Sequence, residues 1–180
     1  MARGIAFLRA VNVGGRVVKM DRLRAAFEKA GFSNVETFIA SGNVVFDLAP
    51  GTKASALEAA IEEMLRNMLG YDVATFVRSG AELRAIAAHQ PFLPAALKRS
   101  PRLNVAFLRQ ELPSKTAASI RTLATAAEAF HLRERELYWL SAVMQSESKI
   151  SNAVFEKIIG QPSTIRSITT IRKMAEKYGA

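Results

Sequence analysis

The chain has 180 residues, of which 49% are hydrophobic and 23% are charged. This composition is typical of a globular protein that buries a core in one domain or in two small ones. The sequence has no apolar run of about 18 residues, and Arg9 interrupts the apolar stretch near the start, so neither a membrane span nor a secretory leader is expected. It also has no cysteine, which excludes disulfides and thiolate sites. We therefore expect a cytoplasmic protein.

The charge of the chain is basic and uneven. Lys and Arg number 25 and Asp and Glu number 16, which gives a net charge of +9. Residues 1–90 hold 11 basic and 9 acidic residues (+2), whereas residues 91–180 hold 14 and 7 (+7). A basic excess favours an anionic partner such as nucleic acid or a nucleotide. A well-solvated basic surface without such a partner is the alternative, because no dense Lys/Arg cluster is present.

The first half of the chain alternates between strand and helix patterns. The spacing of Leu23, Ala26, Phe27 and Ala30 predicts one buried helical face, and Gly31 is a typical helix end. The predicted order is strand, helix, strand, strand, helix, strand, at residues 4–10, 21–30, 35–40, 44–47, 57–68 and 73–77. This order is the split β-α-β of a ferredoxin-like fold.

The second half begins with an internal repeat. Residues 6–9 (Ala-Phe-Leu-Arg) recur at residues 106–109, and both copies lie on predicted strands that open a half. After this strand the sequence predicts a helix from Ser114 and then two strands, at 130–134 and 136–140. A helix at 152–159, a short strand at 163–166 and a last helix from about Ser167 are expected next.

These patterns predict an α+β fold with two ferredoxin-like (α/β-plait) subdomains in tandem. Their antiparallel sheets would be covered by helices, with an extra helix at the C-terminus. We expect the first subdomain at residues 1–78 and a helical connector at 79–101, where Ser79 and Glu82 form a predicted capping box. The second, less regular subdomain would occupy residues 102–180.

Several chemistries are excluded by the residue inventory. The two histidines, His89 and His131, lie in no metal-ligand spacing, so we expect structural or surface roles for both and no metal site. The sequence has no Gly-x-Ser-x-Gly elbow, no Walker A motif and no Rossmann glycine motif. No cofactor is predicted. Tyr138 and Trp139 point to opposite faces of their strand, so one is expected in the core and the other is free to stack on a base.

A glycine-bearing loop after the first strand is the main candidate site. Glycines between a strand and a helix let amide groups turn toward an anion, and nearby Arg and Lys add positive charge. The first two strands of a split β-α-β run parallel, so this loop should lie beside the turn at residues 41–43. The predicted anion-binding residues are Arg9, Asn12, Gly14, Gly15, Arg16, Ser41, Gly42 and Asn43. Two tight turns tied together by Arg9 are the structural alternative.

A second polar cluster lies near the C-terminus, where Ser148-Lys149 precedes one helix and residues 164–170 begin the next. Helix N-termini favour anions, so Lys149, Arg166 and Lys173 are added to the candidate ligand-binding residues. Ordinary capping by Ser and Thr is the alternative explanation.

These motifs resemble those of the bacterial domain of unknown function 1697 family. The resemblance rests on Phe7–Gly15, Thr37–Phe46, Gln90–Phe92, Ser148–Lys149 and Thr164–Lys173, and it covers nearly the whole chain. It implies a pair of α/β-plait subdomains and no established activity, substrate or cofactor. The chain departs from the family pattern at Ser167, where the family usually has Asn. A second departure is the stretch at residues 142–145, where the family has Pro-x-Gly.

Three functions compete at this stage. The first is binding of an anionic ligand, either a small molecule or nucleic acid. Binding in the manner of an RNA-recognition motif is disfavoured, because that module needs a pair of aromatic residues on this strand and residues 41–46 contain only Phe46. The second is an enzyme acting on a phosphorylated or carboxylated small molecule, with Arg9 and Lys149 as electrostatic stabilisers. The third is an interaction protein whose sheet faces, bearing Ile5 and Phe7, pack within or between chains.

Overall fold

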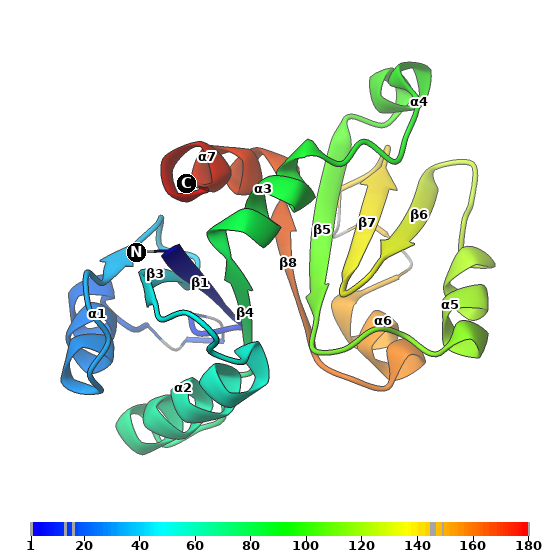
Figure 1. Ribbon diagram of the computed structural model, residues 1–180. Coiled ribbons are helices and arrows are strands. Elements are labelled where there is room, and N and C mark those ends of the chain that lie inside the picture. Colours follow the sequence, from blue (N-terminus) through cyan, green and yellow to red (C-terminus); the bar gives the residue numbers. More distant parts are fainter. Residues whose placement is uncertain (1, 13, 16, 145–146, 149, 180) are drawn as a thin grey trace. The chain divides into compact units, whose positions relative to one another are not determined.

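The computed structural model describes residues 2–179 except 13, 16, 145–146 and 149. Within these residues the chain forms two four-stranded antiparallel sheets with helices against them (Figure 1). One compact unit comprises residues 1–85 and 173–180, and the other comprises residues 86–172. The prediction of two tandem ferredoxin-like subdomains is thereby confirmed, while the boundaries placed at residues 78 and 101 stay predictions.

The first unit contains the sheet order β2-β3-β1-β4. Its elements are β1 (Ala2–Leu8), α1 (Met20–Lys29), β2 (Glu36–Thr37), β3 (Asn43–Leu48), α2 (Ala54–Leu69) and β4 (Thr75–Ser79). The helix α3 (Gly80–Ala88) follows. Alternating strand residues such as Ala6 and Leu8 pack with Phe27 of α1 and Leu65 of α2 in one buried cluster. Helices α1 and α2 therefore cover the same face of this sheet.

The second unit repeats this arrangement with the sheet order β6-β7-β5-β8. It contains α4 (Pro94–Arg99), β5 (Arg102–Leu108), α5 (Ser114–Arg121), β6 (Glu128–Arg133), β7 (Glu136–Ser141), α6 (Asn152–Ile159), β8 (Ser163–Ser167) and the start of α7 (Ile168–Tyr178). Ala106, Leu108 and Trp139 pack with Ile120 of α5 and Phe155 of α6.

The internal repeat seen in the sequence holds at the level of strand register. Ala6 pairs with Val77 across β1 and β4, and Ala106 pairs with Ile165 across β5 and β8. The two Ala-Phe-Leu-Arg copies thus end the central strands of the two sheets. The fourth strand predicted at residues 163–166 is present as β8 and completes the second sheet.

Apart from shifts of a few residues at element ends, the structure departs from the predicted elements at two places. The strand expected at residues 35–40 is only Glu36–Thr37, because Ile39 has a left-handed backbone (φ 50°) and the Phe38 amide donates to the Asn43 carbonyl, which starts the turn early. The connector contains a second helix, α4, that the sequence analysis did not predict. Pro94 lies in the first turn of α4, where proline favours a helix start.

The edge strand β4 has its outward-facing amides bound by glutamates. These are the amides of Thr75, Val77 and Ser79, which donate to Glu62, Glu58 and Glu82 at 2.8, 2.8 and 2.7 Å. The Ser79 hydroxyl also accepts from the Glu82 amide at 3.2 Å, which confirms the predicted capping box. An edge strand whose amides are occupied in this way offers little for pairing with another chain.

The C-terminal end of α7 is tied to the first unit by a polar network centred on Glu36. The Oε2 atom of Glu36 accepts from Lys177 Nζ at 2.8 Å and from the Tyr178 hydroxyl at 2.9 Å. Arg3 donates to Glu36 Oε1 at 3.2 Å and to Asp47 Oδ1 at 2.7 Å. The hydrogen bond from Lys177 contributes most to a lowered pKa of Glu36, so this carboxylate stays ionised at neutral pH.

In the part of the chain that the structure describes, every helix is too short or too polar to cross a membrane.

The contact of Glu58 with β4 generates a test of the fold. Glu58 is 4% exposed, accepts from the Val77 amide and lies 3.9 Å from Arg78 Nη1, which is also buried. Glu58→Ala should lower the free energy of unfolding in urea by at least about 2 kcal/mol, since it leaves a buried amide and a buried guanidinium without this partner. The exposed Glu63→Ala on the same helix should change it by less than about 0.5 kcal/mol. Equal effects of the two substitutions would contradict the role given to Glu58.

Candidate functional site

The loops that follow β1 and β2 lie side by side in the first unit. Both strands are antiparallel to β3, so β1 and β2 are parallel and end at the same edge of the sheet. The Leu8 amide donates to the Gly42 carbonyl at 2.8 Å, and the Arg9 amide donates to the Ala74 carbonyl at 2.8 Å. Arg9, half-buried, therefore lies just beyond the end of β1 rather than on the strand as predicted.

Asn12 fixes the shape of the glycine-bearing loop. Its side-chain Oδ1 accepts from the Val18 amide at 2.6 Å, and its Nδ2 donates to the Ala40 carbonyl at 3.3 Å. The first bond closes the loop on itself, and the second joins it to the turn after β2. Asn12 thus acts as a structural tie within the predicted corner.

The residues of the neighbouring turn are used in the same way. The Nδ2 atom of buried Asn43 donates to the Phe38 carbonyl at 3.0 Å and to Ser41 Oγ at 2.8 Å. Gly42 has a φ of 74°, and a Cβ atom there would lie 2.8 Å from the Val11 side chain. The structure therefore favours the structural interpretation for Gly42 and Asn43, with any ligand contact left to the loop itself.

Gly14 and Gly15 are the exposed part of this corner. Their φ angles are 67° and 80°, and a Cβ atom at either position would meet nothing within 4 Å. Neither amide donates a hydrogen bond to another described residue. Arg16, predicted beside them, lies outside the described residues. The loop then leads to α1, whose N-cap residue Lys19 makes no side-chain capping bond. The first amides of α1 are consequently free of a side-chain cap.

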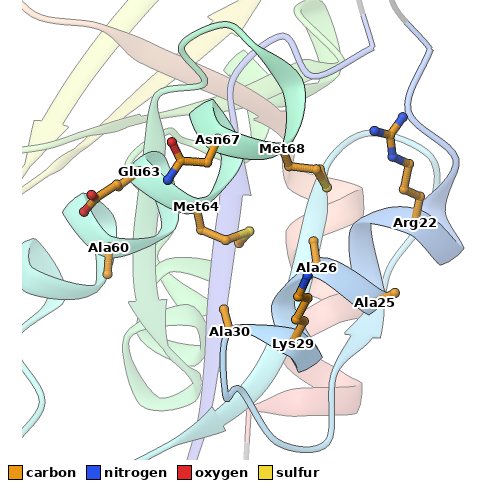
Figure 2. Close-up of a pocket in the computed structure, with 10 residues that line it drawn as sticks. All are labelled: Arg22, Ala25, Ala26, Lys29, Ala30, Ala60, Glu63, Met64, Asn67 and Met68. Atoms are coloured by element: carbon orange, nitrogen blue, oxygen red, sulfur yellow. The ribbon is translucent and has the colours of Figure 1, made fainter.

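A groove of about 660 Å³ runs between α1 and α2 (Figure 2). Met64 and Met68 of α2 extend toward Ala26 of α1, and Arg22 lies at the same end of the groove as Met68. Its volume falls in the usual range for small-molecule sites. Sequence analysis missed this groove, because the alanines that leave space on α1 and α2 look like ordinary helix formers.

The charges around the groove are uneven. The α1 wall carries Arg22 and Lys29, seven residues apart, whereas the α2 wall carries Glu63 and Asn67. Arg22 belongs to the first turn of α1 and Lys29 to the last, so the groove runs along α1 and reaches the helix end that follows the glycine loop. The lining therefore combines an apolar floor with a net positive rim.

The predicted C-terminal cluster is only partly described. Lys149 lies outside the described residues. Arg166 lies on β8, where its Nη1 donates to Thr164 Oγ1 at 2.8 Å and to the Ile165 carbonyl at 2.9 Å, and desolvation lowers the pKa of Arg166 to about 10. Exposed Lys173 belongs to the first unit, whereas Arg166 belongs to the second. Ser167 caps α7 by accepting from the Thr170 amide at 3.2 Å, as the capping interpretation expects.

The aromatic residues considered for stacking on bases are buried in the structure. Trp139 lies in the core of the second unit, and Tyr138, also buried, donates its hydroxyl to the Ile86 carbonyl at 3.1 Å. Phe46 lies in the core of the first unit. Phe7 is 0% exposed on the opposite face of the first sheet. These placements remove the aromatic platform that an RNA-recognition sheet needs.

The two histidines are neighbours in the second unit. The rings of His89 and His131 have centroids 5.1 Å apart, and the His89 ring also packs against Tyr138 at 4.9 Å. Among the described residues no group of three or more His, Asp or Glu side chains is arranged to hold a metal ion. Desolvation contributes most to a lowered pKa of both histidines, and nearby Arg133 lowers each further.

The two sheets define a small α+β protein with tandem ferredoxin-like subdomains, and comparison with known proteins shows its family. The family model described as "Protein of unknown function (DUF1697)" matches residues 1–138, so the chain belongs to this family. The fold is similar to that of a conserved bacterial protein from Streptococcus pneumoniae, with a TM-score of 0.78 and 21% identity over 100% of this chain and 99% of that one. None of the curated proteins matches the chain.

The histidine pair predicts a pH dependence of stability. Because the pKa of each histidine is lowered in the folded protein, the unfolded chain takes up protons at higher pH than the folded chain does. The free energy of unfolding should therefore fall as the pH is lowered from about 7 to about 5. Urea unfolding of His89→Gln/His131→Gln should show a smaller slope over this range. An unchanged slope would show that the pair does not couple protonation to folding.

Proposed function

We propose that the protein binds a small anionic ligand with an apolar portion. Its anionic group would lie at the amides of Gly14 and Gly15 and at the N-terminus of α1, and its apolar portion would lie in the groove between α1 and α2. The observation that carries the proposal is the position of Arg22, which lies in the first turn of α1 and also lines the groove.

The anionic end of the ligand is argued from backbone chemistry. Exposed glycine amides and uncapped helix amides are donors that suit a phosphate or a carboxylate, and the helix dipole adds a partial positive charge there. Lys19 and Arg22 supply full positive charges at the same helix end. Asp21 carries the opposing charge, but its side chain is 94% exposed and lies 3.6 Å from Arg24. Because the loop is held by Asn12, these donors need little reordering on binding.

The apolar end is argued from the groove floor. Ala26, Ala30 and Ala60 leave space between the helices, and Met64 and Met68 are flexible side chains that adapt to an apolar ligand. Burying two methylene groups in such a groove contributes about 1.6 kcal/mol, which corresponds to at least a tenfold gain in affinity.

Calorimetry with octyl phosphate, inorganic phosphate and octanol tests the proposal. Octyl phosphate should bind at least about tenfold more tightly than either fragment. Ala60→Phe should fill the groove and remove this gain while phosphate binding is kept. Ala59→Phe, exposed on the same helix but outside the groove, is the matched control and should change nothing.

A second pair of variants tests the anionic end. Arg22→Gln should weaken both octyl phosphate and phosphate by about tenfold, through loss of a charge-assisted hydrogen bond. Lys53→Gln, exposed at the N-cap of α2 and outside the groove lining, should leave both affinities unchanged. Absence of phosphate and octyl phosphate binding at low salt would overturn the proposal. Binding of phosphate without any gain from the octyl chain would remove the groove from it.

Nucleic acid is the alternative anionic partner, and the net charge of +9 is what favours it. Fluorescence anisotropy with short single-stranded and duplex oligonucleotides distinguishes the two ligands. Contacts restricted to phosphates would give binding that falls steeply with salt and does not distinguish sequences. If oligonucleotides bind at near-physiological salt and octyl phosphate does not compete, nucleic acid replaces the small molecule as the ligand.

A further inference from the structure

The outer strand of the second sheet, β6, has one side that no other strand covers. Among the described residues β6 pairs only with β7, and it lies at the end of its sheet (Figure 1). The edge strand β4 of the first sheet, by contrast, has its outward-facing amides bound by glutamates. An edge whose amides and carbonyls are free is a template for pairing with a further strand.

The register of β6 decides which of its backbone groups face outward. In an antiparallel pair, alternate residues bond to the neighbouring strand, and the residues between them point their amides and carbonyls away from it. The Ala142 amide donates to the Ala127 carbonyl at 2.8 Å, so residues 127, 129, 131 and 133 face β7. Residues 128, 130 and 132 therefore face outward. The contacts of Glu128 agree, because its amide donates to Thr125 Oγ1 at 3.1 Å and its carbonyl accepts from the Thr125 amide at 2.8 Å.

Phe130 and Leu132 form the open part of this edge. No described residue on the outer side of β6 bonds to the amide or the carbonyl of either. The open part is short, because Thr125 occupies the outward groups of Glu128 at one end and the hairpin turn begins at Glu134 (φ 51°) at the other. The edge therefore presents one donor and one acceptor on each of two residues, with a single residue between them.

We propose that the protein forms a two-fold dimer in which β6 pairs antiparallel with β6 of a second copy of the chain. With the two-fold axis at His131, Phe130 of each chain pairs with Leu132 of the other, and every free group of both edges is bonded. An axis at Phe130 would instead place Leu132 opposite Glu128, whose groups Thr125 already occupies. The axis at His131 is therefore the one that fits this edge.

The side chains of β6 are compatible with this register. On the face that packs against the helices, Phe130 lies beside Leu132 of the second copy, which makes an apolar cross-strand pair. On the other face His131 lies opposite His131 of the second copy, and Ala129 lies opposite Arg133. Desolvation contributes most to a lowered pKa of His131, so the two imidazoles are uncharged at neutral pH. No like charges therefore meet at these positions.

Sedimentation equilibrium of the full chain tests the dimer. The weight-average mass should rise from that of one chain toward that of two as the concentration is raised to about 1 mM. Leu132→Pro removes an outward-facing amide without removing a bond to β7, and it should raise the dissociation constant at least about tenfold. Leu132→Val keeps this amide and is the matched control. A single-chain mass at every concentration, or an unchanged dimer in folded Leu132→Pro, would overturn the proposal.

Single thiols test the register and do not depend on the folding of Leu132→Pro. The chain has no cysteine, so one introduced cysteine reports one contact. Under mild oxidation His131→Cys should form a disulfide-linked dimer, because the two positions face each other across the axis. Glu134→Cys, three residues away on each strand, lies about 20 Å from its counterpart and should stay unlinked.

This pair of variants separates the dimer from random collision. The side chain of Glu134 is 69% exposed, whereas His131 is only partly exposed, so collision favours cross-linking of Glu134→Cys. Faster cross-linking of His131→Cys supports the proposed pairing. Faster cross-linking of Glu134→Cys, or a dimer in which His131→Cys stays unlinked, would show that β6 is not the contact.

Discussion

The binding of the edge strand β4 by carboxylates is the constraint on which much of the first unit depends. Glu58 and Glu62 lie one turn apart on α2 and accept from the amides of Val77 and Thr75, two residues apart on β4. This match of a helical turn to a strand repeat sets both the position and the rotation of α2 against the sheet. It also places Ala60 and Met64 toward α1, where they form one wall of the groove.

The second unit uses the same principle with different residues. The Ser163 amide at the start of edge strand β8 donates to Glu156 of α6 at 2.8 Å, as Thr75 does to Glu62. Ser163 and Thr75 hold equivalent register positions opposite Leu108 and Leu8. The repeat therefore extends from the strand order to the way in which each sheet edge is closed. The two halves differ at their surfaces: a groove of about 660 Å³ lies between α1 and α2, whereas a pocket of about 370 Å³ lies beside α4.

The chemistry of the proposed anion site follows from how the corner after β1 is built. The glycine loop and the start of α1 present backbone donors and exposed cations, which suits an anion that keeps part of its hydration. Because Asn12 already holds this loop, a bound anion would meet donors that need little reordering.

Much of the fold was readable from local sequence. The apolar spacing of a helix depends on near neighbours and on burial, so it predicted the helices at residues 21–30 and 152–159. The repeat of residues 6–9 at 106–109 predicted the tandem arrangement. The convergence of the Asn12 loop and the Gly42 turn was also predictable, because the topology of a split β-α-β requires it.

Only the tertiary structure decided how these residues are used. It assigned Asn12 and Asn43 to tying loops together, joined Lys177 and Tyr178 to Glu36 across 141 and 142 residues of sequence, and brought His89 beside His131. It also opened a groove between α1 and α2, whose alanines carry no signal of their own. The physical reason is that hydrogen-bond partners and cavities depend on which distant segments meet, and this information is absent from any local window of the sequence.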